Sequence, residues 1–391
     1  MVDDELTRQQ AAILRGLLLL SAPDAPTAAI NTAAEAIARR AQDPAPPTAA
    51  TPEAAGLSDL RPADDSPRNL HEADLTDAYL TRANLINADL TIANMARAYV
   101  RDADLKRANL TGADLTIANL ARVNLIDADL TVANLARANL KDAKLARAVL
   151  RDAFLKRANL TGADLNRADL TGADLTGANL AGANLNHTIL IDADVTGADL
   201  NRADLTSAEM TGAKLNRADA TGAKLVGASL HGAELIRANL NCGDLTSANL
   251  TSANLDYAIL TGANLAHADL AHAVMYGTDL AHANLAHANL ILANLTLADL
   301  NRANLTRANL TSANLSRANL TSADLSDAIL MSDGPGAPEC TGMRWSERTR
   351  WPAPFGEWLR ERSTPLGGGQ YEVQGAGNSG ADLTAPSAPL R

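Results

Sequence analysis

The sequence predicts an all-β solenoid, in which short extended segments joined by corners wind into stacked coils. Three observations predict this class. Leu recurs at every fifth residue over about two thirds of the chain, Ala stands two residues before nearly every one of these leucines, and Asn or Asp usually lies between the two. A repeat of fixed period decides the fold, because each unit can bury its apolar face only against its neighbours.

The five-residue period excludes a plain helix and a plain strand. A helix turns by about 100° per residue, so leucines at this spacing spiral around it and form no stripe. On a flat strand the side chains alternate between faces, and an odd spacing sends successive leucines to opposite sides. The chain must therefore bend by a fixed angle after each unit.

A single unit shows how such a bend buries the pattern. In Ala103-Asp104-Leu105, an extended chain points Ala and Leu to one side and Asp to the other. We expect Ala and Leu to face inward and Asp to face outward, with Lys106 and Arg107 at the corner. Successive coils then stack through backbone hydrogen bonds around a core of Ala and Leu.

The register runs from Leu70 to Leu330 without an insertion, which gives 53 units. The centres that are not Leu are Met95, Val100, Val195, Met210, Ala220 and Met275. The inward positions that are not Ala are Arg68, Val123, Thr188, Gly243 and Thr278. Because the pattern is unbroken, we expect coils throughout residues 68–332.

The tandem pattern A-[DN]-L-x-x, as in RDADLKRANLTGADLTIANL at residues 101–120, resembles the pentapeptide-repeat family. The resemblance implies the fold of that family, a right-handed quadrilateral β-helix with four units in each coil. At four units per coil, the repeats of this chain would form about 13 coils with the spacing of neighbouring β-strands.

The spacing of the outward acidic residues also favours four sides. Carboxylates stacked one coil apart lie about 4.8 Å from each other and repel, so the coil length should avoid such pairs. Six acidic pairs are 15 residues apart, whereas three are 20 residues apart. The three pairs are Asp174/Asp194, Asp199/Asp219 and Asp279/Asp299.

The chain before the repeats divides into two parts. Residues 1–42 are expected to form a helical hairpin, because residues 4–20 and 26–41 each place apolar side chains on one helical face. Residues 43–67 carry six prolines and are expected to form an extended linker. The hairpin could cap the coils, associate with itself or hold a partner.

Residues 333–374 are expected to cap the last coil. This segment holds all three tryptophans, and aromatic side chains at the end of a Leu-lined stack can cover its core. A short helix near residues 354–362 and a strand near residues 370–373 suit such a cap. Residues 375–391 are predicted to be disordered.

The alternative for the C-terminal segment is a homodimer. The family resemblance implies end-to-end association through a C-terminal element. The residues that would cover the core or meet a second copy are Trp345, Trp351, Phe355 and Trp358.

Composition predicts a cytoplasmic protein that does not insert into a membrane. The net charge is −11, and the two cysteines, Cys242 and Cys340, provide no disulfide framework, which suits a reducing cytosol. The apolar stretch at residues 11–20 is too short to span a bilayer, and it follows acidic rather than basic residues. We therefore expect no export signal.

No set of residues predicts catalysis, a cofactor or a metal site. Ser, Thr, Asp and His recur all along the repeats, so none of them marks a catalytic group, and a closed core offers no cleft. The best metal candidates are His267, His272, His282 and His287, which share one corner position of the unit. A flat outer wall does not supply the third and fourth ligands that zinc requires, so we expect solvated corners.

The charge distribution supplies the functional hypotheses. Residues 69–160 hold 11 acidic and 13 basic residues, whereas residues 161–300 hold 15 acidic and 6 basic residues, a net charge of −9. The resemblance implies that an acidic solenoid can mimic duplex DNA, bind DNA gyrase and protect it from quinolones. Duplex DNA carries one charge per about 1.7 Å, and this stretch falls short of that density.

We therefore expect a non-enzymatic scaffold that binds a protein partner and does not bind nucleic acid directly. Mimicry of DNA towards gyrase or another topoisomerase is the alternative. The candidate acidic interaction surface comprises Asp192, Asp194, Asp199, Asp204 and Asp219.

Overall fold

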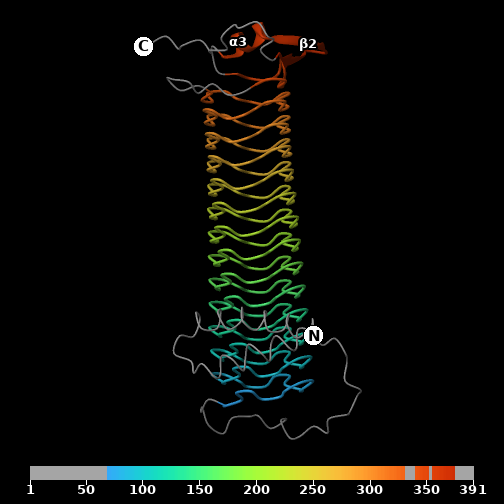
Figure 1. Ribbon diagram of the computed structural model, residues 1–391, viewed down its shortest axis with the longest axis vertical. Helices are drawn as coiled ribbons and strands as arrows, with labels where there is room; N and C mark the ends of the chain where they lie inside the picture. The colour runs from blue at the N-terminus through green and yellow to red at the C-terminus, as the bar shows by residue number, and fades with distance from the viewer. Residues whose placement is uncertain (1–67, 331–339, 352–354, 375–391) are drawn as a thin grey trace, which may run out of the picture. The chain divides into compact units, whose positions relative to one another are not determined.

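The computed structural model describes residues 68–330, 340–351 and 355–374. The predicted hairpin at residues 1–42, the linker at 43–67 and the tail at 375–391 lie outside these residues, as do parts of the predicted cap. The chain divides into two compact units, residues 1–179 and 180–391. In each unit the repeats wind into stacked coils (Figure 1).

The coils of both units have the same length, which is four repeats. In the first unit Asn109 pairs in parallel with Asp89 and with Asp129, and this step holds from residue 69 to residue 179. In the second unit the same step runs from Asn184 to Ile329. Four five-residue segments therefore make one turn, which confirms the four-sided solenoid within each unit.

Every backbone N–H of a typical repeat finds an acceptor. Asn109 donates to the previous coil at 2.9 Å, whereas Leu110 and Gly112 donate to the next coil at 2.6 and 2.9 Å. Ala113 closes the corner by donating to the Leu110 carbonyl at 2.9 Å. The fifth N–H, that of Thr111, donates to the side-chain oxygen of Asn109 at 3.1 Å. A five-residue repeat of this kind thus leaves no backbone N–H unpaired, as a stable fold requires.

The bond to the side-chain oxygen explains why Asn or Asp precedes the central Leu. These residues accept a hydrogen bond from the backbone two positions on, in an Asx turn. A following Thr adds its hydroxyl to the same oxygen, as Thr111 does to Asn109 at 2.7 Å. The predicted outward direction of the Asn or Asp is confirmed. Its hydrogen bond to the backbone of the corner was not predicted from the sequence.

The second corner residue of the repeats adopts a left-handed backbone. Its φ ranges from 51° at Val132 to 68° at Gly172. The third position of a type II turn requires such a positive φ, which favours Gly. Arg, Asp, His and Ser fill many of these positions instead, although the left-handed region costs a side-chain-bearing residue about 1–2 kcal/mol. The closed turn and the bonds to the next coil hold them there.

Ala and Leu form the cores of both units, as the sequence predicts. Leu110 and Ala113, for example, have no exposed surface. Thr278 replaces Ala at one inward position, and its hydroxyl donates to the Leu255 carbonyl at 2.9 Å. The buried hydroxyl is therefore satisfied, as buried polar groups usually are.

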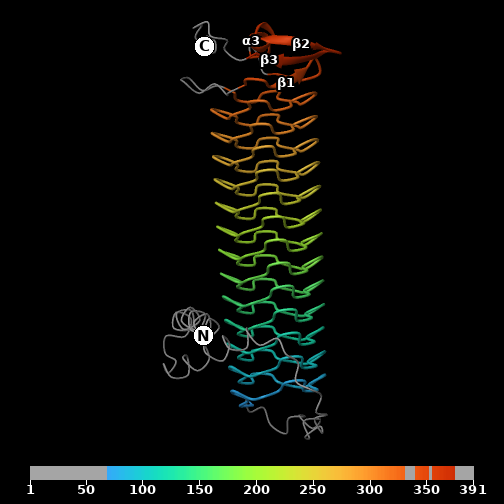
Figure 2. The same ribbon diagram turned by 45° about the vertical axis from the view of Figure 1, so that its right-hand side comes forward.

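The second unit ends in a small antiparallel sheet and a helix (Figure 2). The sheet contains β1 (Arg344–Ser346), β3 (Gln370–Val373) and β2 (Ser363–Gly367), with β3 in the centre. The helix α3 (Phe355–Glu361) buries Phe355 and Leu359. The predicted helix and the predicted strand are confirmed, whereas β1 and β2 are additional elements.

We predict that Ala148→Leu destabilises the first unit and that Val149→Leu does not. Ala148 is fully buried and inward, so added methylenes overpack the core at a typical cost of about 1–3 kcal/mol. Val149 points outward beside it and is half-buried. Thermal unfolding followed by circular dichroism should show a lower Tm for Ala148→Leu alone, and equal Tm values would contradict a packed inward wall.

Candidate functional site

The predicted acidic surface does not form a single cluster. Asp199 pairs in parallel with Asp219 on one face of the second unit. Because each five-residue step moves the chain to the next face, Asp194 and Asp204 lie on the two faces beside it. Asp192 is a corner residue with a φ of 55°. The five carboxylates therefore spread over three faces and a corner, and a joint binding role for them stays a prediction.

Lysines lie beside two of these aspartates. Asp194 pairs in parallel with Lys214, and Asp204 pairs with Lys224. The Lys224 Nζ atom lies 3.8 Å from the Asp204 Oδ2 atom. Such an exposed ion pair adds little stability, but it offsets the negative charge that a DNA mimic would present.

Hydrogen bonds lower the pKa of Asp204 and of Asp219. Burial alone would raise both values, but Thr206 donates its N–H and its hydroxyl to Asp204 at 3.2 and 2.6 Å. Thr221 binds Asp219 in the same way at 3.1 and 2.6 Å. The pKa of each carboxyl lies below its usual value, so both are ionised at neutral pH.

Arginine and aspartate pair between coils at the corners of the first unit. Arg122 donates from Nε and Nη2 to the two carboxylate oxygens of Asp102, both at 2.7 Å. Arg147 holds Asp127 in the same way at 2.7 and 2.9 Å. These hydrogen bonds lower the pKa of the Asp102 and Asp127 carboxyls. The paired aspartates are therefore not free to bind a partner without breaking an ion pair.

The histidines do not converge. His267 and His287 stack on neighbouring coils, with ring centroids 4.7 Å apart, as their spacing predicts. His272 and His282 lie on two other corners, because they are one step along the coil from this pair. Across residues 68–330 and the described parts of the cap, no three His, Cys, Asp or Glu side chains are placed to hold a metal ion.

Residues 340–350 continue the coil ladder of the second unit. The Leu320 N–H donates to the Arg344 carbonyl at 2.7 Å, and the Leu325 N–H donates to the Arg350 carbonyl at 2.8 Å. The Thr349 hydroxyl donates to the Leu320 carbonyl at 2.8 Å. The cap thereby pairs with two segments of the last repeat coil, whose free edges would otherwise invite association.

The predicted cap residues pack against one another. Trp345 is 2% exposed and donates its indole N–H to Ser363 at 2.9 Å. Trp351 lies edge-on to Trp345 and contacts Phe355, whose ring stacks on Trp358. The burial of Trp345 and Phe355 favours the cap, whereas the half-buried Trp351 and Trp358 retain the surface that the dimer hypothesis needs.

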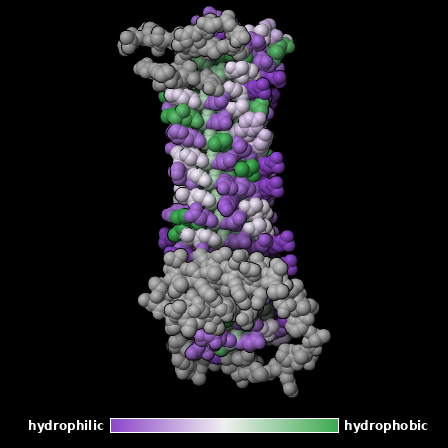
Figure 3. Space-filling model, in the orientation of Figure 1, coloured by the Kyte–Doolittle hydropathy of each residue, from purple (hydrophilic) through white to green (hydrophobic). Residues whose placement is uncertain are grey.

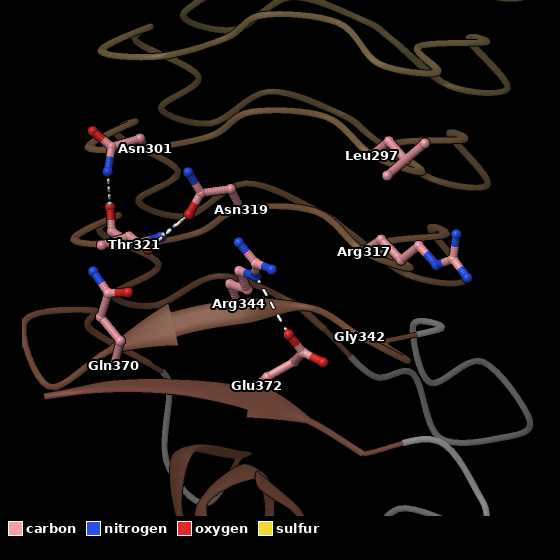
Figure 4. Close-up of a pocket in the computed structure, with 9 residues that line it drawn as sticks. All are labelled: Leu297, Asn301, Arg317, Asn319, Thr321, Gly342, Arg344, Gln370 and Glu372. Carbon is pink, nitrogen blue, oxygen red and sulfur yellow. Dashed lines mark hydrogen bonds and ion pairs between the residues drawn. The ribbon is translucent and has the colours of Figure 1, made fainter. Parts of the chain in front are cut away.

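A mainly polar pocket lies where the last coils of the second unit meet the cap sheet (Figure 4). Its volume is about 520 Å³. The Arg344 Nε atom donates to Glu372 across it at 3.3 Å, and the Arg317 guanidinium points away from Arg344. The lining residues are Leu297, Asn301, Arg317, Asn319, Thr321, Gly342, Arg344, Gln370 and Glu372.

Sequence reasoning missed this pocket and an aromatic stack. Cap residues supply part of the pocket, and the repeat pattern says nothing about their fold. In the first unit, Tyr79 and Tyr99 stack with ring centroids 4.7 Å apart. Aligning the sequence in rows of four repeats places these two tyrosines in one column, so the signal was present.

On the face that Figure 3 shows, the surface of the coloured residues is mainly hydrophilic, and apolar residues are scattered over it.

Comparison with known proteins identifies the family. The model for pentapeptide repeats matches overlapping or adjoining segments that cover residues 69–296, and a further segment at residues 298–331. The matched segments exceed half of the chain, and the protein belongs to the pentapeptide repeat family, whose fold is a right-handed β-helix. A search of curated proteins found no match. Within the part of the chain that the structure describes, no helix has the length and apolar character needed to cross a membrane.

Solved structures of the family are similar to parts of the chain. HetL, involved in heterocyst differentiation regulation in the cyanobacterium Nostoc sp. strain PCC 7120, is 34% identical over 61% of this chain and 88% of its own, with a TM-score of 0.26. QnrB1, a plasmid-mediated fluoroquinolone resistance protein, is 19% identical over 57% of this chain and 91% of its own, with a TM-score of 0.29.

We predict that removal of residues 340–391 causes aggregation. The deletion exposes the amide edges of Leu320 and Leu325 and the core beside them. Light scattering should show large species for this deletion and none for the control deletion of residues 375–391. If the aromatic residues instead join two copies, the larger deletion should yield a soluble monomer, and an unchanged soluble species would contradict both hypotheses.

We predict that stability falls as the pH drops below about 4. The folded-state pKa of Asp204 and of Asp219 is lowered, so each carboxyl stabilises the fold above its unfolded pKa of about 3.9 and loses this effect as the pH falls through the lower folded value. Urea midpoints at pH 7 and pH 3 measure the loss. Asp204→Asn with Asp219→Asn should reduce it, and a midpoint that is constant in pH would refute the assignment.

Proposed function

We propose that this protein is a non-enzymatic scaffold that binds a protein partner through the outer faces of its coils. One observation carries the proposal: the outward position accepts Tyr99, Lys144 and Asp199 in the same backbone pairing. The inward residues and the corners fix the fold, so the outward side chains can vary without moving the backbone. Repeat proteins use such regular surfaces for binding.

The chemistry of the pocket agrees with binding rather than catalysis. Two arginines, a glutamate and several amides line it. Such a set can hold a polar group, but it lacks a nucleophile with an adjacent general base.

The lowered pKa values of Asp204 and Asp219, which lie outside this pocket, do not indicate catalytic groups. They arise from turn hydrogen bonds that are part of the fold.

Capture of a partner tests the scaffold proposal. The full chain is immobilised, lysate of the native host is passed over it, and each retained protein is purified and titrated against the chain by calorimetry. We expect at least one protein to bind saturably with a fixed stoichiometry. Failure of every retained protein to bind in purified form would contradict a scaffold role.

Mimicry of DNA is the second candidate, supported by the net charge of −9 over residues 161–300. In this reading the acidic faces bind gyrase or another topoisomerase and protect it from quinolone-type poisons. Lys214 and Lys224, which pair with two of the candidate aspartates, weaken the likeness to a phosphate backbone. We therefore rank this function below the scaffold.

A gyrase supercoiling assay at low salt separates the two functions. We expect the purified chain to leave supercoiling unchanged. Inhibition would establish mimicry if replacing Asp194, Asp199, Asp204 and Asp219 by Asn abolished it, because Asn keeps the turn cap and removes the charge. The matched control replaces the same number of outward aspartates in the first unit, namely Asp89, Asp104, Asp129 and Asp164.

A further inference from the structure

We propose that one face of the first unit is a docking surface for an acidic segment of a partner protein. The inference rests on the proposed scaffold function and names the surface and the chemistry of the partner. We call this surface the Tyr/Asn face. Its outward residues lie one coil apart and are Tyr79, Tyr99, Asn119, Asn139, Asn159 and Asn179.

The Tyr/Asn face carries no charged outward residue, whereas each of the other three faces within residues 69–179 carries aspartates. Asn139 donates its side-chain amide to Asn119 at 3.3 Å, and Asn159 donates to Asn139 at 3.3 Å. Tyr79 and Tyr99 stack with an angle of 3° between their rings. The face is therefore a regular ladder of amides and phenol rings.

The charges of the first unit are segregated around this face. Residues 69–179 are neutral overall, with 14 acidic and 14 basic residues. The corners that border the Tyr/Asn face hold eight basic and three acidic residues, a net charge of +5, which leaves −5 on the rest. The basic residues are Arg82, Arg97, Arg101, Arg122, Arg137, Lys141, Lys156 and Arg157, and the acidic residues are Asp77, Asp102 and Asp142.

Several of these cations are available to a partner. Arg97 is held by Asp77 at 2.8 and 2.6 Å, and Arg122 is held by Asp102. Five others are exposed and make no ion pair with any residue of the described chain. These five are Arg82, Arg137, Lys141, Lys156 and Arg157. They flank the face on both sides, where they can bind carboxylates as a guanidinium fork or a point charge.

The uncharged centre of the face favours a protein segment. Tyr79 is 73% exposed and Tyr99 is 44% exposed, and tyrosine with arginine is the composition enriched at protein interfaces. An extended segment could place apolar or aromatic side chains over the tyrosines and carboxylates over the bordering cations. Charge complementarity would fix its position and speed its association.

The same geometry disfavours nucleic acid. The two rings are 4.7 Å apart, whereas a base between them would need about twice the 3.4 Å rise of stacked bases. The corner carboxylates of Asp77, Asp102 and Asp142 would also oppose a continuous line of phosphates. A protein segment carries discrete carboxylates and can avoid these positions.

Selection of peptides from a random displayed library against the full chain tests the proposal. We expect the selected peptides to be rich in Asp and Glu, and synthetic copies to bind more weakly as the salt concentration rises. Replacing Arg137, Lys141 and Arg157 by Gln should weaken binding at least tenfold. The matched control replaces Arg107, Lys144 and Arg167 by Gln, which also removes two exposed arginines and one exposed lysine, and should change affinity less than twofold.

A second variant tests the centre of the face. Tyr79→Ser with Tyr99→Ser leaves every charge in place and should also weaken peptide binding. Peptides without acidic enrichment, or equal losses in the Gln variant and its control, would overturn the proposal. Equal binding of a single-stranded oligonucleotide would assign the face to nucleic acid instead. If a partner captured from the host binds the Gln and Ser variants as well as the native chain, the scaffold function stands and this surface is wrong.

Discussion

The backbone hydrogen bonds that join each repeat to the repeats one coil before and one coil after it are the interaction on which the rest of the structure depends. Four amides of a typical repeat bond to neighbouring coils or close the corner, and the fifth, just after the central leucine, takes a side-chain acceptor where Asn or Asp precedes that leucine. Asn109 supplies it for Thr111 at 3.1 Å. Asn or Asp therefore recurs along the chain with the buried Leu, whereas Tyr99 and Lys144 show that the pairing between coils persists where this side-chain acceptor is missing.

The solenoid could be predicted well from the sequence because the five-residue period and the burial of each position in the repeat can be read from the residue types. The inward Ala and Leu and the outward polar residue follow from spacing alone, whereas the four sides were implied by the resemblance to the pentapeptide-repeat family and only favoured by the spacing of the acidic residues. The left-handed corners could not be predicted in this way, because Arg97 and Val132 do not favour a positive φ by themselves. The turn bond and the next coil impose it. The pocket was likewise inaccessible, since Arg344 and Glu372 come from a segment without repeats.

The net charge of a stretch of sequence does not describe how charge is distributed over the faces of the coils. The acidic stretch suggested a single patch, but Asp194, Asp199 and Asp204 point from three successive faces. Conversely, residues 69–179 hold equal numbers of acidic and basic residues, yet these charges separate around the ladder of Tyr and Asn. In a four-sided coil, neighbours in space are four repeats apart in the sequence, so electrostatic arguments must be made face by face.

The coil length also constrains how such a gene can change. A duplication or deletion of four repeats adds or removes one complete turn and leaves every later side chain on its own face. A change of one repeat would preserve the motif and the buried leucines, yet it would rotate all later side chains to the adjacent face. Tyr99 would then no longer lie over Tyr79 if the change fell between them. Gain of four repeats at a time therefore lengthens the protein and keeps the outward residues of each face together, whereas gain of a single repeat changes which outward residues share a face.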